Sequence, residues 1–196
     1  TASTAAAAYI IGELKKEIKI PFGVDMLWDP MATIALGTAT KANFVREIFT
    51  GTYSSDMGIW APDAGKALRY RKNLGSEEML LFFNISAEFA YSQDRRSLSD
   101  RARSVVFSSL PDAILVSGQI TGEAASINDL MSVKKALPNT PVLANTGVKH
   151  DTITQVLTTA DGCIVGSSLK EDGDTWKPVN PERAIEFMNI VNKFRS

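Results

Sequence analysis

The sequence is poor in the residues that most often build metal centres and disulfide scaffolds. Its 196 residues include one cysteine and one histidine. One cysteine excludes an intramolecular disulfide, and one histidine excludes a centre made of several histidines within the chain. Cys163 stands inside an apolar run, where we interpret it as a small buried residue. Scarce cysteine is consistent with a reducing compartment, so we expect a cytoplasmic protein.

The chain also lacks an excess of charge of one sign and any long hydrophobic run. It has 21 basic and 22 acidic residues and a formal net charge of −1, which does not favour binding to nucleic acid or anionic lipid. No run approaches the ~20 apolar residues of a membrane helix, so we expect no integral membrane segment. The alanine-rich start lacks the basic flank and apolar core of a signal peptide.

What the chain does have is a regular alternation of apolar strands and amphipathic helices. An opening helix carries Ile10, Leu14 and Ile18 at helical spacing, and six strand–helix units follow it. Capping residues mark helix starts at Asp29, Ser126, Asp151 and Asn180. The predicted strands cover residues 19–27, 43–48, 79–85, 113–118, 141–146 and 162–167, and long polar loops are expected at 49–62 and 86–97. Such alternation predicts a parallel sheet covered by helices.

Two folds fit this alternation, an open doubly wound sheet and a (β/α)8 barrel. A barrel has about 250 residues in eight units, or about 31 per unit, so six units need about 190 residues. Six strands alone would leave two open edges on a curved sheet. We therefore predict an α/β fold with a single domain over residues 1–196, a (β/α)8 TIM barrel that lacks its first two strands.

Two strand ends near the C-terminus indicate an anion site. Segments 141–148 and 161–170 each run from an apolar strand into glycine and small hydroxyl residues. Glycine allows the backbone to approach a ligand, and the amides that follow can point at an anion. Barrels bind phosphate after their last two strands. We predict a phosphate site made of Gly147, Val148, Gly166, Ser167 and Ser168. The alternative is that the glycines only make tight turns.

Other candidates lie at strand ends, where barrels carry their catalytic groups. Asp25, Arg46 and Glu47 lie there, and we predict catalytic roles for Asp25 and Arg46, because an arginine in a barrel mouth usually binds a carboxylate or a substrate anion. A purely structural Asp25–Arg46 pair is the alternative. Asp56 is a candidate lid carboxylate, and His150 is a weaker acid–base candidate because it has no clustered partner. The substrate-binding candidates are Asn84, Ser117, Thr121, Gly122 and Asn145.

The expected partner is a phosphorylated small molecule, either a sugar phosphate or a nucleotide-like compound. No cofactor motif is evident and no metal centre is predicted. A carboxylate-bound magnesium ion stays an open alternative, although no ligand spacing demands one. A homo-oligomer also stays open.

The chain resembles the BtpA/SgcQ family of TIM-barrel proteins, which is named for a photosystem I biogenesis factor. The resemblance runs from about Ile20 to Met188 and is most specific over residues 160–173, with Arg183 following. Residues 44–46, 56–58, 68–72 and 116–122 also fit. Family members usually begin with two further strands, so the resemblance implies that the six strands here are numbers 3 to 8.

The sequence departs from the family pattern at two places. Members tend to carry an aspartate at the end of strand 5 and a Lys-His pair after it, where this chain has Asn84, Glu88 and Phe89. These residues cannot do the same proton or metal chemistry. The seventh-strand turn, often glycine-serine-glycine, reads Asn145-Thr146-Gly147. If the protein is an enzyme, isomerase, lyase or hydrolase chemistry on a phosphorylated sugar or nucleoside would suit the predicted site. The resemblance implies the alternative, a non-enzymatic assembly factor, and with it peripheral membrane association.

Overall fold

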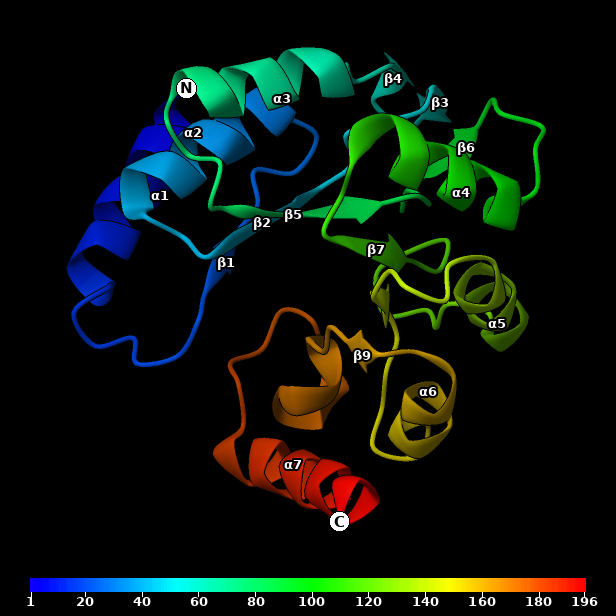
Figure 1. Cartoon of the computed structure of the whole chain (residues 1–196). Helices are drawn as coiled ribbons and strands as arrows, with labels where there is room; N and C mark the ends of the chain where they lie inside the picture. Colours follow the sequence, from blue (N-terminus) through cyan, green and yellow to red (C-terminus); the bar gives the residue numbers. More distant parts are fainter.

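A curved parallel sheet forms the centre of the computed structural model, which describes residues 1–196 (Figure 1). Its six strands lie side by side in the order β1 (Gly23–Val24), β2 (Phe44–Glu47), β5 (Leu80–Asn84), β7 (Ala113–Val116), β8 (Val142–Ala144) and β9 (Gly162–Cys163). Every neighbouring pair is parallel. The sheet does not close, because β1 and β9 each have one neighbour. The predicted barrel without two of its strands is confirmed.

Helices cover the outer face of the sheet and connect its strands (Figure 1). They are α1 (Ala2–Leu14), α2 (Pro30–Thr40), α3 (Ala64–Asn73), α4 (Leu98–Ser109), α5 (Ile127–Ala136), α6 (Ile153–Thr159) and α7 (Pro181–Arg195). Two short 3-10 turns, η1 (Ser167–Leu169) and η2 (Glu171–Gly173), lie between β9 and α7. None of the helices has the length and hydropathy that crossing a bilayer requires.

Three of the four predicted helix caps are confirmed. The side chains of Asp29, Ser126 and Asn180 accept hydrogen bonds from backbone N–H groups in the first turns of α2, α5 and α7. The prediction for Asp151 is wrong, because Thr152 is the N-cap residue of α6. Residues 149–152 form a turn of their own, in which the Thr152 hydroxyl accepts the Lys149 N–H at 3.0 Å. That turn moves the helix start beyond Asp151.

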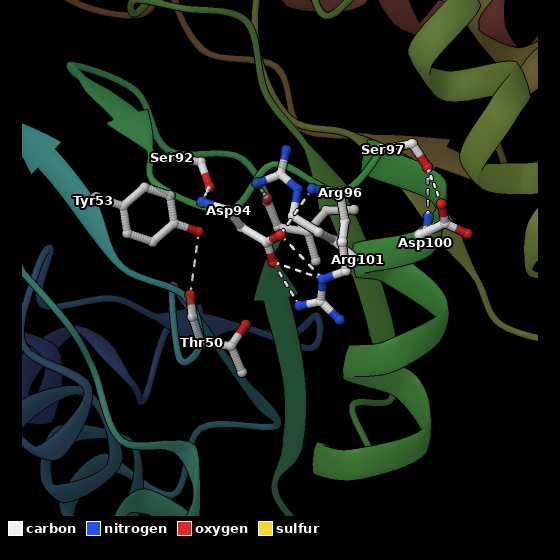
Figure 2. Close-up of polar contacts among 9 residues, drawn as sticks. Thr50, Tyr53, Ser92, Asp94, Arg96, Ser97, Asp100 and Arg101 are labelled. Carbon is white, nitrogen blue, oxygen red and sulfur yellow. Dashed lines mark hydrogen bonds and ion pairs between the residues drawn. The ribbon is translucent and has the colours of Figure 1, made fainter.

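The two segments predicted as loops contain a second sheet. Strands β3 (Tyr53–Ser55), β4 (Gly58–Trp60) and β6 (Ala90–Ser92) pair antiparallel in the order β4-β3-β6. Strands of three residues are too short for sequence periodicity to reveal. Tyr53 anchors this sheet in a small cluster with Ile48 and Ala87. Its hydroxyl donates to the Thr50 carbonyl at 3.2 Å, and burial raises the pKa of Tyr53 to about 12 (Figure 2).

Local polar contacts fix the connection from β6 to α4 (Figure 2). The Asp94 carboxylate accepts the backbone N–H of Arg96 at 2.9 Å and also the guanidinium of Arg96. These hydrogen bonds lower the pKa of Asp94 to about 2. The Ser97 hydroxyl then accepts the Asp100 N–H at 3.1 Å and caps α4. The second sheet is thereby tied to the helix that follows it.

The main core lies between the sheet and the helices, and the inner face of the sheet is less well covered. Val45, Leu81 and Ile114 are buried toward the helices. Phe44 and Phe82 stack on the inner face at 4.6 Å but are only half-buried. The edge strands β1 and β9 have two residues each, fewer than predicted, because each can pair on only one side.

Candidate functional site

A cavity of about 790 Å³ opens at the carboxyl ends of the strands and is lined by 19 residues. Because consecutive parallel strands place their ends at one edge, the loops after β8 and β9 meet there. The cavity brings together ten of the residues predicted from the sequence: Arg46, Thr121, Gly122, Asn145, Gly147, Val148, His150, Gly166, Ser167 and Ser168. All five residues of the predicted phosphate site therefore line one space.

The two glycines of these loops differ in what a side chain at each position would meet. Gly147 has a positive φ of 65°, and a Cβ there would lie 2.1 Å from the backbone nitrogen of Ala124. No side chain fits at Gly147 without moving the neighbouring loop. A Cβ at Gly166 would meet no atom within 4 Å. Gly166 therefore leaves open space at the cavity wall, where a ligand could approach the backbone.

The backbone N–H groups of this region have no partner inside the protein. Those of Gly147, Val148, Gly166, Ser167 and Ser168 donate no hydrogen bond to another protein group. Val148 and Ser168 are nevertheless buried. Buried N–H groups are nearly always paired, by protein, water or a bound group. An acceptor in the cavity, such as an anion, would satisfy several of them at once.

A chain of polar side chains crosses the inner face of the sheet below the cavity. Arg46 donates to Asp25 Oδ2 at 3.0 Å and to Asn145 Oδ1 at 2.6 Å. Asn145 donates to Ser117 Oγ at 2.8 Å, and Asn84 donates to the same oxygen at 3.4 Å. Arg46 thus forms the structural pair with Asp25 and also lines the cavity. Asn84 and Ser117 do not line the cavity. Ser117 accepts the Asn145 hydrogen bond and so helps to position that side chain.

Glu47 lies beside Arg46 on β2 but points away from the cavity. It is 2% exposed, and its Oε1 accepts the Trp28 N–H at 2.8 Å. Burial, followed by the charge of Asp25 nearby, raises the pKa of Glu47 to about 10, so the carboxyl is protonated at neutral pH. Trp28 has a positive φ of 66°, and its ring packs on Trp60 of the second sheet at 4.6 Å. Glu47 therefore holds a strained segment at the rim.

His150 is bound on both sides by residues of the C-terminal segment. Its Nδ1 lies 3.1 Å from Ser168 Oγ, and its Nε2 lies 2.9 Å from the carbonyl oxygen of Arg183. Arg183 in turn donates from Nε to the Ser168 carbonyl at 2.9 Å. The edge of the ring meets Phe187 of α7. Tertiary structure thus supplies the partners that the sequence did not reveal.

Comparison with known proteins identifies the family. The sequence model of the BtpA family matches residues 1–193. This chain belongs to the BtpA family. It is 42% identical over 193 residues to the sgc region protein SgcQ of Escherichia coli (strain K12), covering 98% of this chain and 72% of that protein. It is 29% identical to the photosystem I biogenesis protein BtpA of Synechocystis sp., covering 97% of this chain and 67% of that protein.

Solved structures of low sequence identity share the fold of this BtpA-family chain. N-(5'-phosphoribosyl)anthranilate isomerase from Pyrococcus furiosus matches with a TM-score of 0.63 at 12% identity, over 95% of this chain and 80% of that one. The native KDPGal structure matches with a TM-score of 0.57 at 14% identity, over 96% and 76%. These matches confirm the TIM-barrel-like architecture.

The remaining predicted residues of the BtpA-family chain fall partly outside the cavity. The Thr121 hydroxyl, inside it, donates to Glu88 Oε2 at 2.7 Å. Asp56 is exposed in the turn between β3 and β4 and does not line the cavity. No three His, Cys, Asp or Glu side chains gather closely enough to hold a metal ion.

Sequence reasoning gave no site role to several residues that line the cavity, namely Glu88, Lys149, Asp172, Thr175 and Arg183. Arg183 could have been found, because it lies three residues after the Asn180 cap and its position on α7 aims it at the preceding turns. The others stand in irregular segments whose course the sequence does not indicate.

Proposed function

We propose that this BtpA-family chain binds a phosphorylated small molecule, a sugar phosphate or a nucleotide-like compound, with its phosphate between the loops after β8 and β9. The observation that carries the proposal is a set of five residues that line one cavity and whose backbone N–H groups have no partner in the protein. Hydrogen bonds to a charged acceptor contribute about 1.5–3 kcal/mol each. A volume of about 790 Å³ is also large enough for a ligand of this size.

Arg46 and Asn145 would bind the part of the ligand beyond the phosphate. Their hydrogen bond and the Asp25–Arg46 pair hold both side chains in place at the inner end of the cavity. A guanidinium so placed can position or polarise a carbonyl, hydroxyl or second anionic group. Isomerase, lyase or hydrolase chemistry at a phosphorylated sugar or nucleoside would suit this arrangement. The isomerase from Pyrococcus furiosus, named for a phosphoribosyl compound, agrees with that ligand class.

Thermal unfolding with and without ligand tests the proposal. Ribose 5-phosphate at saturating concentration should raise the melting temperature by about 5 °C, and ribose should not. Gly166→Val should abolish the shift and leave the unliganded melting temperature nearly unchanged, because its side chain would enter open space. Gly12→Val in α1, also at a glycine with open space around it, should keep the shift. If no sugar or nucleoside phosphate shifts the wild-type protein, the proposal is wrong.

A non-enzymatic assembly or stability factor is the second candidate function. The observation that favours it is the 29% identity to a photosystem I biogenesis protein. It predicts a stable protein partner in pull-down experiments whose binding does not change in Gly166→Val. Absence of any phosphate-dependent shift together with such a partner would favour this candidate.

A further inference from the structure

We infer that His150 controls the direction of the Ser168 hydroxyl, so that the cavity binds a tetrahedral dianion tightly only when the imidazole carries a second proton. His150 is thus a positioning residue that acts through Ser168. The inference rests on the proposed phosphate site, and it adds a dependence on proton binding that a site made only of backbone amides would not have.

The hydrogen-bond partners of His150 determine the tautomer of the neutral ring. Nε2 faces the carbonyl oxygen of Arg183 at 2.9 Å, and a carbonyl can only accept, so Nε2 carries a hydrogen. The neutral ring then presents a lone pair at Nδ1. The Ser168 hydroxyl, 3.1 Å away, must donate to that lone pair. Its oxygen therefore offers only lone pairs to the cavity, which repel an anion.

Protonation of His150 reverses this arrangement. A proton taken from solvent onto Nδ1 is donated to Ser168 Oγ, and the hydroxyl hydrogen is released to point at a ligand oxygen. Ser168 is nine-tenths buried and lines the cavity, so water competes weakly for that hydrogen. The site gains one charge-assisted donor and one positive charge by the same step.

The protonation of His150 sets the net charge of the side chains that line the cavity. Besides His150, three basic and three acidic side chains line it: Arg46, Lys149, Arg183, Glu88, Asp151 and Asp172. Their formal charges cancel. Lys149 and Asp151 flank His150 on its own loop, and Arg183 of α7 contacts it through its carbonyl oxygen. Asp172 of η2 lines the same cavity and pairs with Lys177. Phe187 of α7 brings only an uncharged ring, which is perpendicular to the imidazole. A proton on His150 therefore changes the sum from zero to positive.

Sulfate is the probe that isolates the protein's contribution, because it stays a dianion between about pH 5 and 8, the range in which imidazoles change charge. Its dissociation constant is measured from the amide chemical shifts of Gly147 and Gly166 at about pH 5.5 and about pH 8. Wild type should bind at least about tenfold more tightly at the lower pH. His150→Gln should bind weakly and with equal affinity at both pH values. Ser168→Ala should show a smaller difference than wild type, because His150 still gains its charge but no longer directs a hydroxyl.

Ser167→Ala is the matched control, because the Ser167 hydroxyl pairs with Thr175 Oγ1 at 2.7 Å and not with His150. It should keep the difference between the two pH values. Equal wild-type affinity at both pH values, a retained difference in His150→Gln, or an undiminished difference in Ser168→Ala overturns the inference and leaves the phosphate site standing. Absence of sulfate and sugar phosphate binding at either pH overturns both. Circular dichroism confirms that each variant is folded.

Discussion

The polar groups at the two ends of the sheet rim differ in whether they have partners within the protein. After β8 and β9, five residues line a cavity, and their backbone N–H groups have no hydrogen-bond partner in the protein. At the ends of β1 and β2, side chains make the contacts: Arg46 pairs with Asp25, and Glu47 accepts the backbone N–H of Trp28. Unsatisfied donors indicate where a ligand binds, whereas satisfied side chains indicate what supports it.

The two regions should respond differently to mutation. The cavity loops depend on backbone geometry, so the substitutions that destabilise them most are those that add a side chain. The β1–β2 end depends on contacts between side chains, so the substitutions that destabilise it most are those that remove one partner of a pair.

Gly147→Ala should lower the free energy of unfolding by about 4 kcal/mol, because the new Cβ overlaps the backbone of Ala124 and the residue has a positive φ. Gly166→Ala should change it by less than about 1 kcal/mol. Urea denaturation followed by circular dichroism measures both. Equal losses in the two variants would show that the loops do not differ as described.

Arg46→Met should lower the free energy of unfolding by about 3 kcal/mol, because it leaves the Asp25 carboxylate and the Asn145 amide oxygen without their donor. Arg103→Met is the control, since its ion pair with Asp100 is exposed and 4.0 Å long, and it should change stability by less than about 0.5 kcal/mol. Chemical denaturation at neutral pH is the measurement. A loss in Arg46→Met no larger than in the control contradicts the supporting role of this pair.

Glu47→Gln should raise the free energy of unfolding by about 2 kcal/mol at pH 8 and have almost no effect at pH 4. Burial raises the pKa of Glu47 from its ordinary value of 4.5 to about 10, so the folded state keeps a proton that the unfolded state releases. Stability therefore falls as pH rises between these values. Glutamine keeps the acceptor for Trp28 and carries no charge.

Urea denaturation as a function of pH measures this effect of Glu47→Gln. The exposed Glu78→Gln is the control and should show the same small effect at both pH values. A Glu47→Gln effect that does not depend on pH would mean that Glu47 is ionised in the folded protein.

The sequence predicted the fold and the cavity loops better than the supporting contacts. The alternation of strands and helices predicted the parallel sheet, and glycine with small hydroxyl residues after two consecutive strands predicted which loops meet. The second sheet was missed because its strands are too short to show a period. The partners of His150 were missed because Ser168 and Arg183 lie 18 and 33 residues away along the chain.

The sequence by itself determined the order of elements, because apolar periodicity and capping residues act within a few positions of the chain. It also specified a residue without a side chain at position 147, where a Cβ would overlap the backbone of Ala124. Tertiary structure alone decided the protonation of Glu47, the double contact of Arg46 and the partners of His150. These depend on burial and on distances between segments far apart in the chain, which sheet curvature brings together.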